Sequence, residues 1–93
     1  MIKRQRKQGQ VQVTFSLESD RPVSVVGDFN DWTPMEHPLK KRSNGKWSVT
    51  IPLEAGRYSF RNLADGGEFF DDPDADEIED NGIGDTHGVL VVE

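Results

Sequence analysis

The stretch QVQVTFSLE (Gln10–Glu18) alternates strictly between polar and apolar side chains. Its apolar positions are Val11, Val13, Phe15 and Leu17. Because successive side chains of a β-strand point to opposite faces, this period of two predicts a strand with one face buried and the other in water. The stretch therefore indicates a sheet that packs on one side only.

The same reasoning predicts strands elsewhere in the chain. They are VSVV at residues 23–26, GKWSVTIPL at 45–53, AGRYSFRNL at 55–63 and GVLVV at 88–92. Turn-forming residues separate them, such as SDRP at residues 19–22 and SNG at 43–45. No stretch shows a helical period, so the predicted fold class is an all-β antiparallel sandwich in a single domain.

Size and composition limit the kind of protein. A chain of 93 residues is long enough for one domain with one core, and without cysteine it has neither disulfides nor thiolate metal ligands. The first residues carry no apolar run of the kind found in a secretory signal. No stretch approaches the roughly 18 apolar residues of a membrane span. We expect a stand-alone, soluble, cytoplasmic monomer with no membrane partner.

Charge is distributed unevenly along the chain. The basic residues near the N-terminus are Lys3, Arg4, Arg6 and Lys7, whereas residues 65–85 contain no Lys or Arg. The net charge of −6 argues against a nucleic-acid partner, because phosphate binding needs clustered cations. We expect residues 1–9 to form a flexible basic tail and residues 10–93 to form the domain.

A hairpin is predicted around ADG, residues 64–66, which suits a three-residue loop ending in a left-handed glycine. Folding about this loop sets Arg61 opposite Phe69 and Phe60 opposite Phe70. Phe60 and Phe70 then share the core face, and Arg61 and Phe69 share the outer face. A slip of one residue would exchange the two phenylalanines. Asn62 falls in phase with Phe60, where an apolar residue would be expected.

The aromatic residues divide into two groups. Trp47 is in phase with Val49 and Ile51 and is expected in the core, as is Phe29. Trp32 ends the polar turn VVGDFNDW, residues 25–32, and together with Phe69 it is left outside by the strand pattern. Two exposed aromatic rings beside an arginine indicate a ligand site more than incidental exposure.

Three segments, VSVVGDFNDWTP, GKWSVTIPLEAGRYSFRNLADG and FFDDPDAD, occur in an order that resembles the family 48 carbohydrate-binding modules. That family includes the glycogen-binding domain of the AMP-activated protein kinase beta subunit and the N-terminal modules of isoamylases and glycogen branching enzymes. The resemblance runs from about residue 11 to residue 92. It implies an immunoglobulin-like, early-set β-sandwich and non-catalytic binding of α-1,4-linked glucan of the glycogen or starch type.

The resemblance also implies four carbohydrate-binding residues. Trp32 falls on the stacking tryptophan of the family, Arg61 on a lysine that donates to sugar hydroxyls, and Phe69 near the second stacking tryptophan. Ile83 lies near a leucine that contacts the glucan. Phe69 replaces a tryptophan, and Gly88 stands where an asparagine is expected.

Catalysis and metal binding suit this sequence less well than glucan binding. Carboxylates are abundant in FFDDPDADEIEDNGIGD, residues 69–85, but a small sandwich offers no deep pocket, so no catalytic residues and no enzyme activity are expected. The spacing of Asp72, Asp74 and Asp76 does not match a calcium loop, so no metal or cofactor is expected. The alternative is a protein–protein interaction or accessory domain that has lost sugar binding, with a separate glycogen-metabolising enzyme as its partner.

Overall fold

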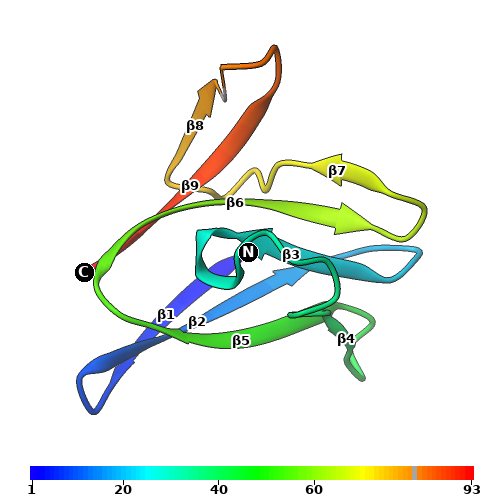
Figure 1. Cartoon of the computed structure of the whole chain (residues 1–93). Coiled ribbons are helices and arrows are strands. Elements are labelled where there is room, and N and C mark those ends of the chain that lie inside the picture. The colour runs from blue at the N-terminus through cyan, green and yellow to red at the C-terminus, as the bar shows by residue number, and fades with distance from the viewer. Residues whose placement is uncertain (81) are drawn as a thin grey trace.

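The computed structural model describes residues 1–80 and 82–93, which form two antiparallel sheets with no α-helix (Figure 1). One sheet has the strand order β1-β2-β5-β4, and the other has the order β3-β6-β9-β8 with β7 also paired to β6. The elements are β1 (Ile2–Lys7), β2 (Gln10–Leu17), β3 (Val23–Gly27), the 3-10 turn η1 (Asp28–Asn30), β4 (Lys40–Lys41), β5 (Trp47–Leu53), β6 (Gly56–Ala64), β7 (Glu68–Phe70), β8 (Glu77–Asp80) and β9 (Thr86–Val92). The predicted all-β sandwich is confirmed.

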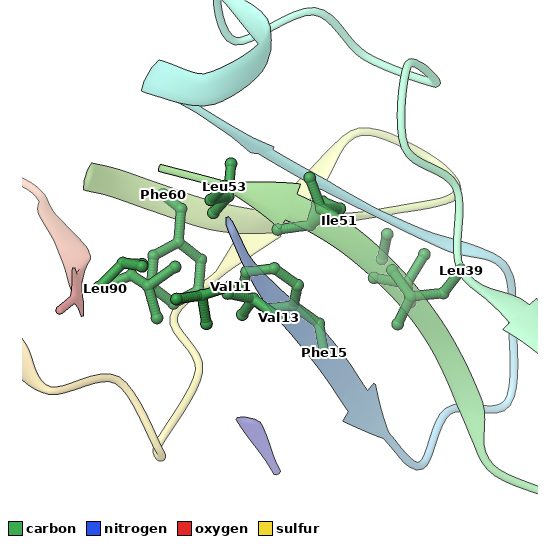
Figure 2. Packing of buried hydrophobic residues seen from close by; sticks show 12 residues of the cluster. Val11, Val13, Phe15, Leu39, Ile51, Leu53, Phe60 and Leu90 are labelled. Carbon is green, nitrogen blue, oxygen red and sulfur yellow. The ribbon is translucent and has the colours of Figure 1, made fainter. Parts of the chain in front are cut away.

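The core lies between the two sheets and is built from the apolar phase of each strand (Figure 2). Phe15 of β2 and Phe60 of β6 meet across it, with ring centroids 5.4 Å apart. Trp47 and Phe29 are half-buried and pack against this cluster, as predicted. The Trp47 indole Nε1 donates to the Ser19 carbonyl at 3.0 Å, which ties β5 to the loop before β3.

The N-terminal segment differs from its prediction. Residues 1–9 were expected to be a flexible tail, but Ile2–Lys7 form β1 and pair with β2 from Ile2 opposite Phe15 to Lys7 opposite Gln10. Arg4 reaches across to β9, where its Nε donates to the Val91 carbonyl at 3.1 Å. The strand is charged on both faces, so it shows no period of two, and such charges suit an edge strand because they discourage edge-to-edge aggregation.

The β6–β7 hairpin has a different register from the predicted one. Asn62 pairs with Phe70 and Leu63 pairs with Phe69, so the pairing of Arg61 with Phe69 and of Phe60 with Phe70 was wrong. The loop is Asp65–Gly67, one residue later than predicted, because Gly67 at φ +88° also takes a left-handed conformation. Moving the loop by one residue shifts each pairing by two, which preserves the faces.

The two faces of β6 are therefore as predicted even though its partners are not. Phe60 is buried and Phe70 packs against the core cluster. Arg61 and Phe69 lie on the opposite, outer face, with the Arg61 guanidinium carbon 5.3 Å from the Phe69 ring centroid. The expected Arg–Phe pair is therefore present on this face, but only Phe69 is well exposed, because the Arg61 side chain is largely covered.

One edge of β6 is shared by two strands that diverge. β9 pairs with Gly56–Phe60, whereas β7 pairs with Asn62–Ala64, so Arg61 lies where the two partners separate. The β8–β9 hairpin projects away from the sandwich from this point (Figure 1). Asn62 is fully buried on the inward face of β6, and its amide nitrogen and oxygen have no hydrogen-bond partner within the described residues.

No helix in the part of the chain that the structure describes is long and apolar enough to cross a membrane.

Candidate functional site

A depression on the outer face of the β3-containing sheet brings together three of the four residues predicted for the site. It is lined by Trp32, Arg61, Phe69 and His87. Trp32 comes from the loop after η1, Arg61 from β6, Phe69 from β7 and His87 from β9. Four separate elements therefore converge on one surface feature.

Trp32 is held in an unusual backbone conformation. Asp31 and Trp32 both have positive φ angles, 54° and 58°, which non-glycine residues rarely adopt. The Trp32 amide donates to the Gly27 carbonyl at 2.9 Å, and the indole Nε1 donates to Asp28 Oδ1 at 3.2 Å. These bonds offset the strain and leave 38% of the residue exposed.

Asp28 connects this loop to the sheet. While its Oδ1 accepts from the Trp32 indole, its Oδ2 accepts from the Ser59 amide of β6 at 2.8 Å. The close approach of β3 to β6 requires glycine at position 27, because a Cβ there would lie 2.4 Å from the Ser59 carbonyl oxygen. The acidic residue of the turn is therefore a positioning group for the Trp32 indole.

Asn30 and Phe29 account for the rest of the turn. The Asn30 amide accepts from the Gly27 N–H at 3.1 Å and donates to the Val25 carbonyl at 3.0 Å. Phe29 packs inward, with its ring centroid 6.0 Å from that of Phe15. Asn30 and Asp28 thus bond the backbone around a tight turn, and of its two aromatic residues only Trp32 is exposed.

Arg61 is fixed from three sides and is only 14% exposed in its side chain. Its Nε donates to Asp71 Oδ1 at 3.1 Å and its Nη1 donates to Asp85 Oδ2 at 3.0 Å, while the guanidinium stacks on Phe69. The Thr86 amide and then the Arg61 guanidinium hold the pKa of the Asp85 carboxyl below its usual value. A guanidinium held this way offers its remaining N–H groups in a fixed direction.

Two buried valines belong to the outer face of this sheet. Val26 pairs with Arg61 and Val89 pairs with Ser59, and both valines are buried although they belong to the outer face and not to the core cluster. Phe69 is 47% exposed at the surface. The site is consequently a shallow surface with two partly exposed rings and a fixed cation between β7 and β9.

The structure does not bring the fourth predicted residue into this depression. Ile83 lies in the loop between β8 and β9, is 86% exposed, and does not line the depression. His87, which no sequence motif singled out, does line it, and its Nε2 lies 3.4 Å from Glu79 Oε1. Its strand phase, shared with Val89 and Val91, was the signal that places it on the outer face.

Two flat rings and fixed hydrogen-bond donors suit a ligand that has apolar faces and a polar rim. Among the residues that the structure describes, no group of three or more His, Asp or Glu side chains is arranged to hold a metal ion. The fold and this surface define the class: a small immunoglobulin-like β-sandwich with an aromatic surface depression.

Comparison with known families identifies the domain more closely. The model of carbohydrate-binding module 48, described as the isoamylase N-terminal domain, matches residues 3–76. This match covers most of the chain, and the protein belongs to the carbohydrate-binding module 48 family, whose domains are early-set immunoglobulin-like sandwiches. The resemblance drawn from the sequence motifs is confirmed.

Curated relatives carry the same kind of segment. The chain is 44% identical over 54 residues to the 1,4-alpha-glucan branching enzyme GlgB of Deinococcus radiodurans. The aligned segment covers 56% of this chain and 8% of the enzyme. It is 49% identical over 47 residues to 1,4-alpha-glucan branching enzyme GlgB 2 of Xanthomonas campestris pv. campestris strain 8004. That aligned segment covers 47% of this chain and 6% of the enzyme. The chain thus spans less than a tenth of the length of these relatives.

Proposed function

We propose that this domain binds α-1,4-linked glucan of the glycogen or starch type without catalysing its cleavage. Trp32 and Phe69 serve as stacking surfaces for glucose rings, and Arg61 donates to hydroxyl groups at their rim. The observation that carries the proposal is that these three side chains, distant in sequence, line one depression. Membership of a carbohydrate-binding family supports it.

The chemistry of a glucose unit explains why this arrangement suits it. A pyranose ring has faces of C–H groups and an equatorial rim of hydroxyls, so an indole can cover a face without demanding hydrogen bonds. One face of a tryptophan contributes about 2–3 kcal/mol at roughly 25 cal/mol per Å². Association itself costs an estimated 4 kcal/mol or more, so one ring alone does not hold a sugar.

Two rings and several rim bonds on an oligosaccharide should give a dissociation constant on the order of micromolar to millimolar, and affinity should rise with chain length. In this proposal Ile83 contacts the glucan from the β8–β9 loop. The domain acts as a cytoplasmic monomer, and a glycogen-metabolising enzyme is its protein partner, which the branching-enzyme names of its relatives support.

Isothermal titration calorimetry with maltoheptaose tests the proposal. We expect saturable binding by the wild-type domain and a loss on the order of 30-fold in Trp32→Ala, which corresponds to about 2 kcal/mol. Ile78→Ala is a matched control, since Ile78 is another exposed apolar residue and lies outside the depression. Its affinity should equal that of the wild type, and circular dichroism should show that both variants are folded.

An accessory domain without sugar binding is the second candidate, because the relatives are enzymes in which this segment is a small part. No heat of binding with maltoheptaose from a folded domain would favour this candidate over glucan binding. Release of reducing ends from soluble starch by the pure domain would contradict the non-catalytic assignment.

A further inference from the structure

A second depression lies next to the Trp32–Phe69 site. Its lining includes Ser24, Pro34, Met35, Leu63, Gly66 and Gly67. It is bounded by the loop that follows Trp32 on one side and by the β6–β7 hairpin on the other. The same two segments supply Trp32 and Phe69 to the first depression.

The strand register places a residue of each depression side by side. Leu63 pairs directly with Phe69 across the hairpin, so these side chains are neighbours on the outer face. Leu63 also follows Arg61 by two residues along β6, a step of about 6.6 Å on the same face. Phe69, which lines the first depression, and Leu63, which lines the second, are therefore adjacent.

The wall opposite the hairpin is a methionine held in place. Met35 has a φ of +68°, and its thioether sulfur accepts a hydrogen bond from Ser24 Oγ at 3.2 Å. The residue is nevertheless 67% exposed. A large apolar side chain fixed in a left-handed backbone, yet left open to water, offers a soft apolar surface to a ligand.

The facing side of this depression consists largely of backbone. Gly67, at φ +88°, has no atom within 4 Å of the position where a Cβ would stand. A ligand can therefore approach the backbone of this loop closely. The Gly67 and Asp65 N–H groups already donate to the Ala64 and Pro22 carbonyls, at 3.0 and 2.8 Å, so the loop is expected to meet a ligand through its other peptide groups. An apolar wall opposite exposed peptide groups again suits a ring with apolar faces and a hydroxyl rim.

We propose that this groove, lined by Ser24, Pro34, Met35, Leu63, Gly66 and Gly67, binds further glucose units of the same glucan chain. This inference rests on the proposed function and extends it. The Trp32–Phe69 site holds one part of the chain, and the groove receives the units that continue past Phe69. The domain consequently selects long linear glucans over short maltooligosaccharides, and Met35 is the residue that sets this preference.

Nuclear magnetic resonance titration distinguishes the two depressions, with maltotriose and maltoheptaose as probes. The Trp32 indole N–H signal should shift with both sugars. The Met35 methyl and the Gly66 and Gly67 amide signals should shift with maltoheptaose and stay in place with maltotriose. This pattern would place the additional glucose units in the groove.

Variants provide the second readout. Met35→Ala should leave maltotriose affinity unchanged and lower maltoheptaose affinity on the order of fivefold. Because Met35 is mostly exposed, the variant should keep the unfolding midpoint of the wild type. Ile78→Ala, a similarly exposed apolar residue outside both depressions, should alter neither affinity.

Two results would overturn the inference in different ways. If the Trp32 signal shifts with both sugars while the groove signals stay in place, the groove takes no glucan and the proposed function stands. This is the outcome expected if the groove receives a protein segment instead. If the Trp32 signal also stays in place with both sugars, the proposed function is wrong and the extension is wrong with it.

Discussion

The two tryptophans lie in different surroundings, one suited to stabilising the fold and the other to contacting a ligand. Trp47 is half-buried against the core, and its indole N–H donates to a backbone carbonyl of another loop. Trp32 is tied by the same indole atom to Asp28, a carboxylate of its own turn, and its ring lies over the outer face of a sheet. Both are anchored, but only Trp47 packs against the core cluster.

An anchored aromatic residue therefore need not be part of the core. Trp47 is in a strand, where alternation decides its side, and its burial adds to the free energy of folding. Trp32 is in a strained turn, where hydrogen bonds decide its direction and keep the ring exposed. Orientation by a polar tether is what we expect of a side chain selected for contact with a ligand.

The largest effect is expected from truncating each tryptophan. Trp47→Ala should lower the free energy of unfolding by about 3 kcal/mol, because it leaves a cavity beside the core. Trp32→Ala should lower it by less than about 1 kcal/mol, since its ring leaves no core cavity. Urea denaturation of the two variants measures both values. Equal losses in the two variants would contradict the assignment of Trp47 to the core and of Trp32 to the surface.

Truncation of Asp28 should have the next largest effect on the free energy of unfolding. Asp28→Ala removes the acceptors of both the Trp32 indole and the Ser59 amide, so a loss of about 1–2 kcal/mol in unfolding free energy is expected. The same variant should weaken maltoheptaose binding, because the Trp32 ring loses its orientation. Asp20→Ala, which removes a highly exposed carboxylate that does not line the depression, is the control for the change in charge. If the two variants behave alike, Asp28 is not a positioning residue.

Phe69→Trp should raise affinity for maltoheptaose about threefold, because an indole offers a larger face than a phenyl ring. Phe69 is half-exposed, so the unfolding midpoint should change little. Phe69→Ala should instead lower the affinity for maltoheptaose. Calorimetry on the pair measures the contribution of the second ring, and unchanged affinity in both variants would assign the site to Trp32 alone.

The smallest effect concerns the charged β8–β9 hairpin. The Arg57 guanidinium donates to Glu77 and holds the pKa of that carboxyl below its ordinary value of 4.5. A carboxyl whose pKa is lowered by folding stabilises the folded state above its unfolded pKa. That contribution is lost as the pH falls from about 4.5 through the lowered value.

Thermal unfolding between pH 5 and pH 3 should therefore depend slightly less on pH in Arg57→Gln than in the wild type. The difference should be small because both side chains are about half exposed, so solvent and salt screen the pair. A steeper dependence in Arg57→Gln would contradict the assigned direction of the pKa shift.

The fold was predictable where one face of a strand is buried. Alternation in residues 10–18 and 45–53 identified β2 and β5, and it placed Trp47 correctly. It failed for β1, because a charged edge strand has no apolar phase to detect. It also missed the register of the β6–β7 hairpin, where two successive glycines allow two loop positions.

The aromatic residues of the site were predictable, but the carboxylates that position its side chains were not. The strand pattern and the family resemblance pointed to Trp32, Arg61 and Phe69, which the structure brings together. Asp28 accepts one of its two hydrogen bonds from the Ser59 amide, 31 residues away in sequence, and no local pattern reveals this contact. The carboxylates of Asp71 and Asp85 meet Arg61 only because β7 and β9 diverge beside it.

Fluorescence of two single-tryptophan proteins tests the central claim most directly. Trp47→Phe leaves Trp32 as the only reporter, and its emission should change saturably as maltoheptaose is added. Trp32→Phe leaves Trp47, whose emission should stay constant throughout the titration. A constant signal from Trp32, or a saturable change from Trp47, would contradict the assignment of the exposed indole as the surface on which glucan stacks.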